Sequence, residues 1–301
     1  MWSVAEEIAF REDLFQSVLN AAIRVDGTLS RSELGSFDYA GTKVRVIDSM
    51  GGIWNPGASW SLTDPLRATL SINTTNSGKY DDEEKSSGLW KYDYQTGGVG
   101  GKNNKLRAAM EFQLPVLWLV QQDNGRYIPY KVYVIQDSPA DNYCLIAPDI
   151  LLARAVFSDS PIERRYAERL MKQRLHQPAF RAKVLGAYET KCAVCRLGHG
   201  NLLDAAHITA DSEESSSTSV TNGLSLCKIH HASYDTNLMG IDSNYVVHIR
   251  KALLAEKDGP MLEYGLQKMN QSKILIPHNK GHQPDRDRLS ARFEVFVNEN
   301  T

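Results

Sequence analysis

The chain has 301 residues and a formal net charge of −2, with 42% hydrophobic and 23% charged residues, which is ordinary for a folded globular protein. This length favours two domains, and the nearly neutral charge does not by itself indicate a nucleic-acid binder. The N-terminus lacks the basic and apolar regions of a signal peptide. No run of about 18 apolar residues would span a membrane. Four cysteines indicate a reducing cytoplasm rather than a disulfide framework.

The N-terminal half combines helical and strand-like patterns. Apolar residues recur with a helical period over residues 4–25, and residues 29–34 are typical of a capped helical turn. A further short helix is predicted over residues 104–113. β-rich segments separated by Gly, Pro, Asn and Asp lie at residues 43–47, 68–72, 115–120 and 131–135. We therefore predict an α+β protein whose N-terminal domain, residues 1–150, is built on a curved sheet or barrel.

Aromatic and acidic residues gather in the middle of this domain. Tyr80 is followed closely by Asp82 and Glu83. Tyr92 comes twelve residues after Tyr80 and is followed directly by Asp93. One interpretation is that these aromatic side chains form the wall of the barrel and its core.

The same order of residues resembles the SRA (YDG) domain, a PUA-like barrel that flips a modified cytosine out of duplex DNA. The resemblance implies that Tyr80 and Tyr92 stack on the two faces of the flipped base. It also implies that Asp82 or Glu83 accepts a hydrogen bond from the exocyclic amine of the cytosine. Two further carboxylates compete for this role, those of Asp81 and Asp93.

A basic, amphipathic segment follows the predicted sheet. Apolar residues recur with a helical period over residues 160–186, and we predict a helical connector over residues 151–186. Its basic residues continue as far as Arg196. They form either a solvated helix face or a surface that contacts DNA phosphates.

Two pairs of metal-ligand residues follow, each pair separated by two residues. They are Cys192 with Cys195, and Cys227 with His230. Structural zinc prefers four ligands of this kind, arranged in two such pairs. We therefore predict a structural Zn²⁺ held by these residues.

The segment between the pairs is rich in residues that suit hydrolysis. His207 ends an apolar run, Asn222 follows fifteen residues later, and His231 comes directly after the last zinc-type ligand. Together with the flanking pairs, they resemble the signature of the HNH, or ββα-metal, nucleases. The resemblance implies that His207 is the general base and that Asn222 fixes its tautomer or holds its loop. It makes His231 a ligand of Mg²⁺ or Mn²⁺, with Asp235 and Asp204 as further candidate ligands.

The combined hypothesis is a modification-dependent restriction endonuclease. An SRA/PUA-like domain would flip 5-methylcytosine or 5-hydroxymethylcytosine, and a zinc-stabilised HNH domain, residues 187–301, would hydrolyse a nearby phosphodiester. One ββα-metal site cuts one strand, so we expect a homodimer on double-stranded DNA. We also expect a role in the bacterial cytoplasm against phage DNA. Candidate contacts to the DNA backbone are Lys105, Arg107, Arg174 and Arg181.

Two alternatives remain open. The N-terminal domain could instead sense phosphorothioate linkages, N6-methyladenine or ordinary sequence while the nuclease stays the same. The protein could also bind DNA without cutting it, with a zinc-stabilised domain that keeps its fold but has no catalytic activity.

Overall fold

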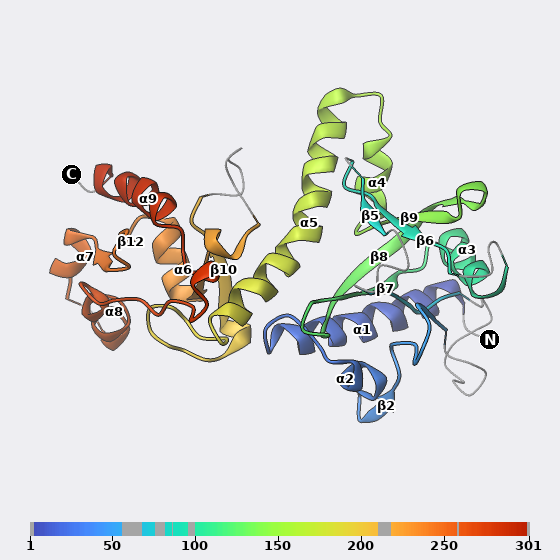
Figure 1. Cartoon of the computed structure of the whole chain (residues 1–301), viewed down its shortest axis with the longest axis horizontal. Helices are drawn as coiled ribbons and strands as arrows, with labels where there is room; N and C mark the ends of the chain where they lie inside the picture. Colours follow the sequence, from blue (N-terminus) through green and yellow to red (C-terminus); the bar gives the residue numbers. More distant parts are fainter. Residues whose placement is uncertain are drawn as a thin grey trace. The chain divides into compact units, whose positions relative to one another are not determined.

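The structure is a computed structural model that describes residues 3–55, 68–75, 82–85, 87–95, 100–209, 218–257 and 259–299. The chain forms two compact units, one comprising Met1–Ala22 and Gly27–Pro178, the other Ile23–Asp26 and Ala179–Thr301. In Figure 1 the first unit runs from blue to yellow-green, and the second unit from Ala179 on runs from yellow to red. The predicted limits at residues 150 and 186 stay a prediction. In the described part of the chain, no helix is both long and apolar enough to cross a bilayer.

The helices predicted at residues 4–25, 29–34, 104–113 and 160–186 are found close to these limits, and the predicted connector at residues 151–186 contains a second, shorter helix before the long one. A capping box starts α2, because the Ser30 side chain accepts from the backbone of Glu33 and the Glu33 carboxylate accepts from the backbone of Ser30. Asp149 caps α4 in a similar way, accepting from the backbone N–H groups of Leu151 and Leu152. The described helices are α1 (Val4–Ile23), α2 (Arg31–Gly35), η1 (Gly101–Asn103), α3 (Asn104–Glu111), η2 (Pro139–Asp141), α4 (Ile150–Val156) and α5 (Pro161–Ala187), of which α5 belongs to the first unit as far as Pro178 and to the second from Ala179 on.

A seven-stranded sheet with the order β3-β4-β7-β8-β9-β6-β5 forms the centre of this unit. Its strands are β3 (Ile53–Trp54), β4 (Ser71–Thr74), β5 (Glu83–Glu84), β6 (Trp90–Asp93), β7 (Val116–Gln121), β8 (Tyr127–Ser138) and β9 (Tyr143–Ala147). Only β4 and β7 run parallel among the described pairings. The long strand β8 pairs first with β7 and then with β9, with a register shift between Val134 and Gln136. Such a shift bends a sheet, because one extra residue strengthens the local twist.

Helices cover this sheet through apolar faces. Leu14, Phe15 and Val18 of α1 share a buried cluster with Leu117 and Leu119 of β7. Figure 1 shows α1 running alongside these strands. A second buried cluster joins α4 and the first half of α5 to β9. A separate hairpin of β1 (Phe37–Tyr39) and β2 (Thr42–Val44) completes the unit.

The predicted α+β class is confirmed, and the four predicted strand segments each contain strand residues. The strand predicted at residues 43–47 is shorter, since β2 ends at Val44. Within the described residues, β3 and β5 are the ends of the sheet and no pairing between them closes it. The closed barrel therefore stays a prediction.

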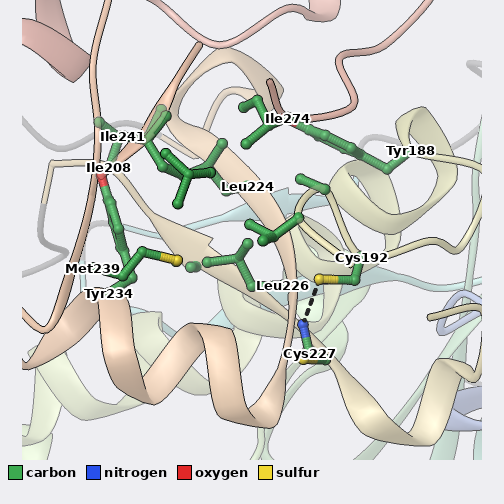
Figure 2. Close-up of a cluster of buried hydrophobic side chains, with 14 of the residues drawn as sticks. Tyr188, Cys192, Ile208, Leu224, Leu226, Cys227, Tyr234, Met239, Ile241 and Ile274 are labelled. Atoms are coloured by element: carbon green, nitrogen blue, oxygen red, sulfur yellow. Dashed lines mark hydrogen bonds between the residues drawn. The ribbon is translucent and has the colours of Figure 1, made fainter. Parts of the chain in front are cut away.

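The second unit is built around two short hairpins and the helices that pack on them. β10 pairs antiparallel with β11, and β12 with β13. Figure 2 shows the buried side chains between these elements, among them Leu224, Leu226, Tyr234 and Met239. The elements are η3 (Gly200–Leu202), β10 (Leu203–His207), η4 (Val220–Asn222), β11 (Gly223–Cys227), α6 (Lys228–Asp235), β12 (Met239–Ile241), β13 (Val247–Ile249), α7 (Lys251–Ala255), α8 (Pro260–Gly265), η5 (Gln267–Met269), η6 (Lys280–His282) and α9 (Arg286–Asn298).

Candidate functional site

The four predicted zinc ligands come together from two local structures. Cys192 and Cys195 lie on a tight turn, in which the Cys192 carbonyl accepts from Arg196 N–H at 3.0 Å and Cys192 N–H donates to the Leu197 carbonyl at 2.9 Å. Arg196 closes the turn with φ at 65°. Cys227 is the last residue of β11, and His230 lies in the first turn of α6. A backbone hydrogen bond from Cys227 to the Cys192 sulfur, dashed in Figure 2, links the two halves.

The ligand atoms lie close enough together to surround one metal ion. All four lie within 4.8 Å of one another. The sulfurs of Cys195 and Cys227 are 3.9 Å apart, and His230 Nδ1 lies 3.1 Å from the Cys227 sulfur and 3.5 Å from the Cys192 sulfur. Four ligands at about 2.0–2.3 Å from a central Zn²⁺ would be separated by about 3.3–3.8 Å.

The second nitrogen of His230 supports the same interpretation. Its Nε2 lies 2.8 Å from the Gly265 carbonyl, which can only accept a hydrogen bond. Nε2 therefore carries the proton, and the lone pair of a neutral ring is left on Nδ1, which faces the sulfurs. Outer partners of this kind orient the histidine ligands of metal sites. These four residues form a possible metal site.

β10, β11 and α6 form a strand–strand–helix motif that starts beside this cluster. His207 is the last residue of β10 and pairs in register with Gly223, the first residue of β11. Its imidazole is half-buried and stacks on the ring of Phe180, with the ring centroids 4.0 Å apart. The predicted general base thus lies at the end of a strand, as expected.

Asn222 is fully buried and holds the loop that follows His207. Its Oδ1 accepts from Thr209 N–H at 2.9 Å, and its Nδ2 donates to the Thr209 carbonyl at 3.2 Å. Its own carbonyl accepts from Ile208 N–H at 2.9 Å. Of the two roles predicted for Asn222, these contacts correspond to holding the loop.

We expect Asn222→Ala to destabilise the second unit by about 1 kcal/mol, because two half-buried backbone groups of Thr209 would lose their hydrogen-bond partners. Chemical denaturation followed by circular dichroism would measure this loss. Asn201→Ala, at an exposed position of η3, is the matched control and should change the unfolding free energy little. Equal stability of the two variants would show that the Asn222 side chain does not hold the loop.

His231 lies between two carboxylates, one on each side of its ring. Its Nδ1 is 3.3 Å from Asp204 Oδ2 and its Nε2 is 3.3 Å from Asp235 Oδ2. Lys228 Nζ donates to both oxygens of Asp204, at 2.6 and 2.7 Å. The hydrogen bond from His231 and the ion pair with Lys228 lower the pKa of Asp204 to about 2. In turn, the bond to Asp204 and the nearby charge of Asp235 raise the pKa of His231.

This arrangement has the donor chemistry of a Mg²⁺ or Mn²⁺ site. Imidazole nitrogen and carboxylate oxygen are both ligands that such ions accept. The two carboxylates face opposite ring nitrogens. An ion bound to either nitrogen would therefore have one carboxylate beside it. Among the described residues, only the Cys192 cluster brings three or more ligand atoms together within 4.8 Å.

The residues of the predicted base pocket lie in the first unit. Tyr80 falls outside the described residues, and Glu83 belongs to β5, where it pairs with Lys91 in the sheet register. Asp82 accepts from the Thr74 hydroxyl at 2.7 Å and from Asp93 N–H at 2.8 Å. Burial raises the pKa of Asp82.

Two other predicted pocket residues make contacts inside the first unit. Tyr92 is only 2% exposed, and its hydroxyl donates to the Gly52 carbonyl at 3.1 Å. The Asp93 carboxylate lies 3.1 Å from Lys91 Nζ. Tyr92 is therefore buried in this structure, and its stacking on a flipped base stays a prediction.

An aromatic cluster missed from the sequence lies beside Asp82. The ring of Trp118 lies 5.0 Å from that of Trp90 and 5.2 Å from that of Tyr130. Its indole N–H donates to the Thr74 hydroxyl at 2.9 Å, and that hydroxyl donates to Asp82. Trp118 lies within an apolar strand segment, where nothing in the sequence pattern marks it out from core residues.

The four predicted backbone-contact residues make contacts within the protein. Arg107 Nε lies 2.6 Å from Asp137, and Arg174 Nη1 lies 2.6 Å from Asp149. Arg181 donates to the Gly200 carbonyl at 2.6 Å and to the Leu203 carbonyl at 3.1 Å. Lys105 lies in α3, where its carbonyl accepts from Thr69 N–H at 3.0 Å. Their contacts with DNA stay predictions.

Comparison with known proteins identifies the strand–strand–helix motif. Residues 192–242, which include both ligand pairs and the motif, match the HNH endonuclease family. The predicted HNH nuclease motif is therefore confirmed. No curated protein matches the chain.

Three solved structures are similar at low sequence identity. The modification-dependent TagI restriction endonuclease is 16% identical, over 90% of this chain and 92% of its own, with a TM-score of 0.33. The SRA domain of SUVH5 with hemimethylated CG DNA is 16% identical, over 40% of this chain and 84% of its own, with a TM-score of 0.29. The phosphorothioation-dependent type IV restriction endonuclease ScoMcrA is 11% identical, over 69% of this chain and 54% of its own, with a TM-score of 0.27.

Proposed function

We propose that this HNH endonuclease cuts double-stranded DNA that carries a modified cytosine. The observation that carries the nuclease half is the motif at residues 203–235. There His207 ends β10, and His231 on α6 lies between Asp204 and Asp235, inside the segment that matches the HNH endonuclease family. We assign recognition of the modified cytosine to the first unit, which is called the reader below.

In the proposed reaction, His207 acts as the general base. A neutral imidazole near pH 7 takes a proton from the attacking water. Asn222 keeps the loop after His207 in place through its two bonds to Thr209. His231, with either Asp204 beside its Nδ1 or Asp235 beside its Nε2, would hold Mg²⁺ or Mn²⁺. Once bound, such an ion offsets the negative charge that develops on the phosphate oxygens.

The Cys192 cluster has a structural role in this proposal. Three thiolates and one imidazole are a donor set typical of Zn²⁺ in closed four-coordinate sites. With all four positions taken by protein ligands, a Zn²⁺ there would leave none for water or phosphate. Its effect would be to join β11 and α6 to the turn at Cys192.

For the reader, we propose that a flipped 5-methylcytosine or 5-hydroxymethylcytosine stacks between Tyr80 and Tyr92. Asp82 or Glu83, or alternatively Asp93, would accept the hydrogen bond of its exocyclic amine. The contacts of Asp82 support it in this role, because Thr74 and the Asp93 backbone hold its carboxylate in one orientation. A carboxylate has about four acceptor sites, so two bonds leave room for the base.

The proposed active form is a homodimer. A single site of this kind cuts one strand, so a break in both strands needs two sites on the same DNA. The physiological setting we propose is the bacterial cytoplasm, where such an enzyme would restrict phage genomes with modified cytosine.

Cleavage of one plasmid in several modified forms tests this proposal. The plasmid is prepared unmodified, with 5-methylcytosine, with 5-hydroxymethylcytosine, with N6-methyladenine and with phosphorothioate linkages, and each form is incubated with Mg²⁺ or Mn²⁺. We expect cutting only of the two modified-cytosine forms. If only one of the other forms is cut, the first unit recognises that modification instead. Equal cutting of all five forms would contradict recognition by base flipping but would still agree with a nuclease.

A further inference from the structure

Phe180 of α5 lies flat against the imidazole of His207. The ring centroids are 4.0 Å apart and the ring planes differ by only 10°. Phe180 is 3% exposed, and both residues belong to the second unit. A flat contact of this kind restricts the imidazole, because turning its plane would drive a ring edge into the phenyl group.

The strand opposite His207 is shaped to allow this contact. Gly223 pairs with His207 across the hairpin. A Cβ atom on Gly223 would come within 2.9 Å of Phe180 Cζ and would also clash with Val184 one turn later on α5. Real Cβ atoms do not approach other atoms so closely, so a side chain at position 223 would displace Phe180 and Val184 from their present positions.

We infer that Phe180 is a positioning residue for His207, an inference that rests on the proposed role of His207 as general base. The phenyl ring sets the plane of the imidazole and so the direction of the nitrogen that receives the proton. The face of an aromatic ring also attracts cations within about 6 Å of its centre. When His207 takes the proton and becomes an imidazolium, this attraction strengthens, so Phe180 favours the transition state over the ground state.

Replacement of the ring by an aliphatic side chain tests the inference. Phe180→Leu, and Phe180→Met as a second variant of similar volume, keep an apolar side chain in the core but remove the flat ring. Val184→Ala is the matched control, because Val184 is fully buried on the same helix and packs near Gly223. All are compared with wild type in single-turnover nicking of modified plasmid, with thermal unfolding measured in parallel.

We expect the Phe180 variants to cut about tenfold to a hundredfold more slowly at saturating DNA, with KM unchanged, since a small misplacement of a catalytic group has effects of this size. Val184→Ala should keep its rate despite a comparable loss of Tm. As a readout independent of activity, the NMR signals of the His207 ring should lose their ring-current shift in the Phe180 variants only.

The outcomes separate the inference from the proposed function. Suppose that His207→Ala is inactive, and that the rates of the Phe180 and Val184 variants fall in parallel with their Tm. This result would overturn the positioning role alone. An unchanged His207 NMR signal in Phe180→Leu would overturn it too. Full activity of His207→Ala would overturn both the proposed base and this inference.

Discussion

His207→Ala is expected to slow DNA cleavage by about 10²–10⁴-fold while leaving DNA binding unchanged. The imidazole is the proposed acceptor of the proton from water, and an alanine offers no acceptor at that position. The substitution removes one half-buried side chain at the end of β10, so the hairpin register with Gly223 should persist. Single-turnover nicking of modified plasmid measures the rate, and a gel-shift titration measures binding.

His278→Ala is the matched control for this change. The side chain of His278 is 90% exposed and lies outside the HNH segment, so its loss should leave the rate unaffected. A His207→Ala protein that cuts at the wild-type rate would contradict the assignment of the base. Inactivity of the wild-type protein itself with Mg²⁺, Mn²⁺, Co²⁺ and Ni²⁺ would favour a DNA-binding protein without catalysis.

Cys227→Ser is expected to release the proposed Zn²⁺ and to destabilise the second unit by several kcal/mol, because metal binding contributes directly to the folding free energy of such sites. Cys227 joins β11 to α6 and accompanies His230 in the metal site. Without the metal, α6 loses its tether to the turn at Cys192, and His231 loses its position relative to Asp204. Metal content is measured by native mass spectrometry, and stability by thermal unfolding with and without a chelator.

Cys144→Ala provides the comparison. Cys144 is a buried cysteine of β9 in the first unit, far along the chain from the Cys192 cluster. Its replacement should leave one metal ion per chain and should not sensitise the protein to chelation. A Cys227→Ser protein that retains its metal and its Tm would rule out the proposed site.

Much of the nuclease motif could be predicted because its determinants are local. Cys192 and Cys195 belong to one turn, and Cys227 and His230 to one strand–helix junction, so the spacing along the chain largely sets the spacing in space. The same holds for His231 and Asp235, which are one helical turn apart on α6. The helices were predictable for a similar reason, since the periodicity of apolar residues reports directly on a helical face.

The N-terminal domain was less predictable because its contacts join distant segments. Tyr92 is buried and its hydroxyl donates to the Gly52 carbonyl, a contact that its place twelve residues after Tyr80 does not predict, while its stacking role stays a prediction. Trp118, Thr74 and Asp82 come from three different segments and meet only because β4 and β7 pair in a parallel register. No spacing in the sequence encodes that register.

The α+β class, the grouping of the four candidate metal ligands and the HNH nuclease motif could be predicted from the sequence, because each depends on patterns within a few residues of the chain. The surroundings of the reacting groups depend instead on the tertiary structure. Lys228 reaches Asp204 across the strand–helix junction, and Phe180 stacks on His207 beside Gly223, where a side chain would displace it. These contacts depend on how elements pack, and packing is set by shape and volume rather than by spacing along the chain.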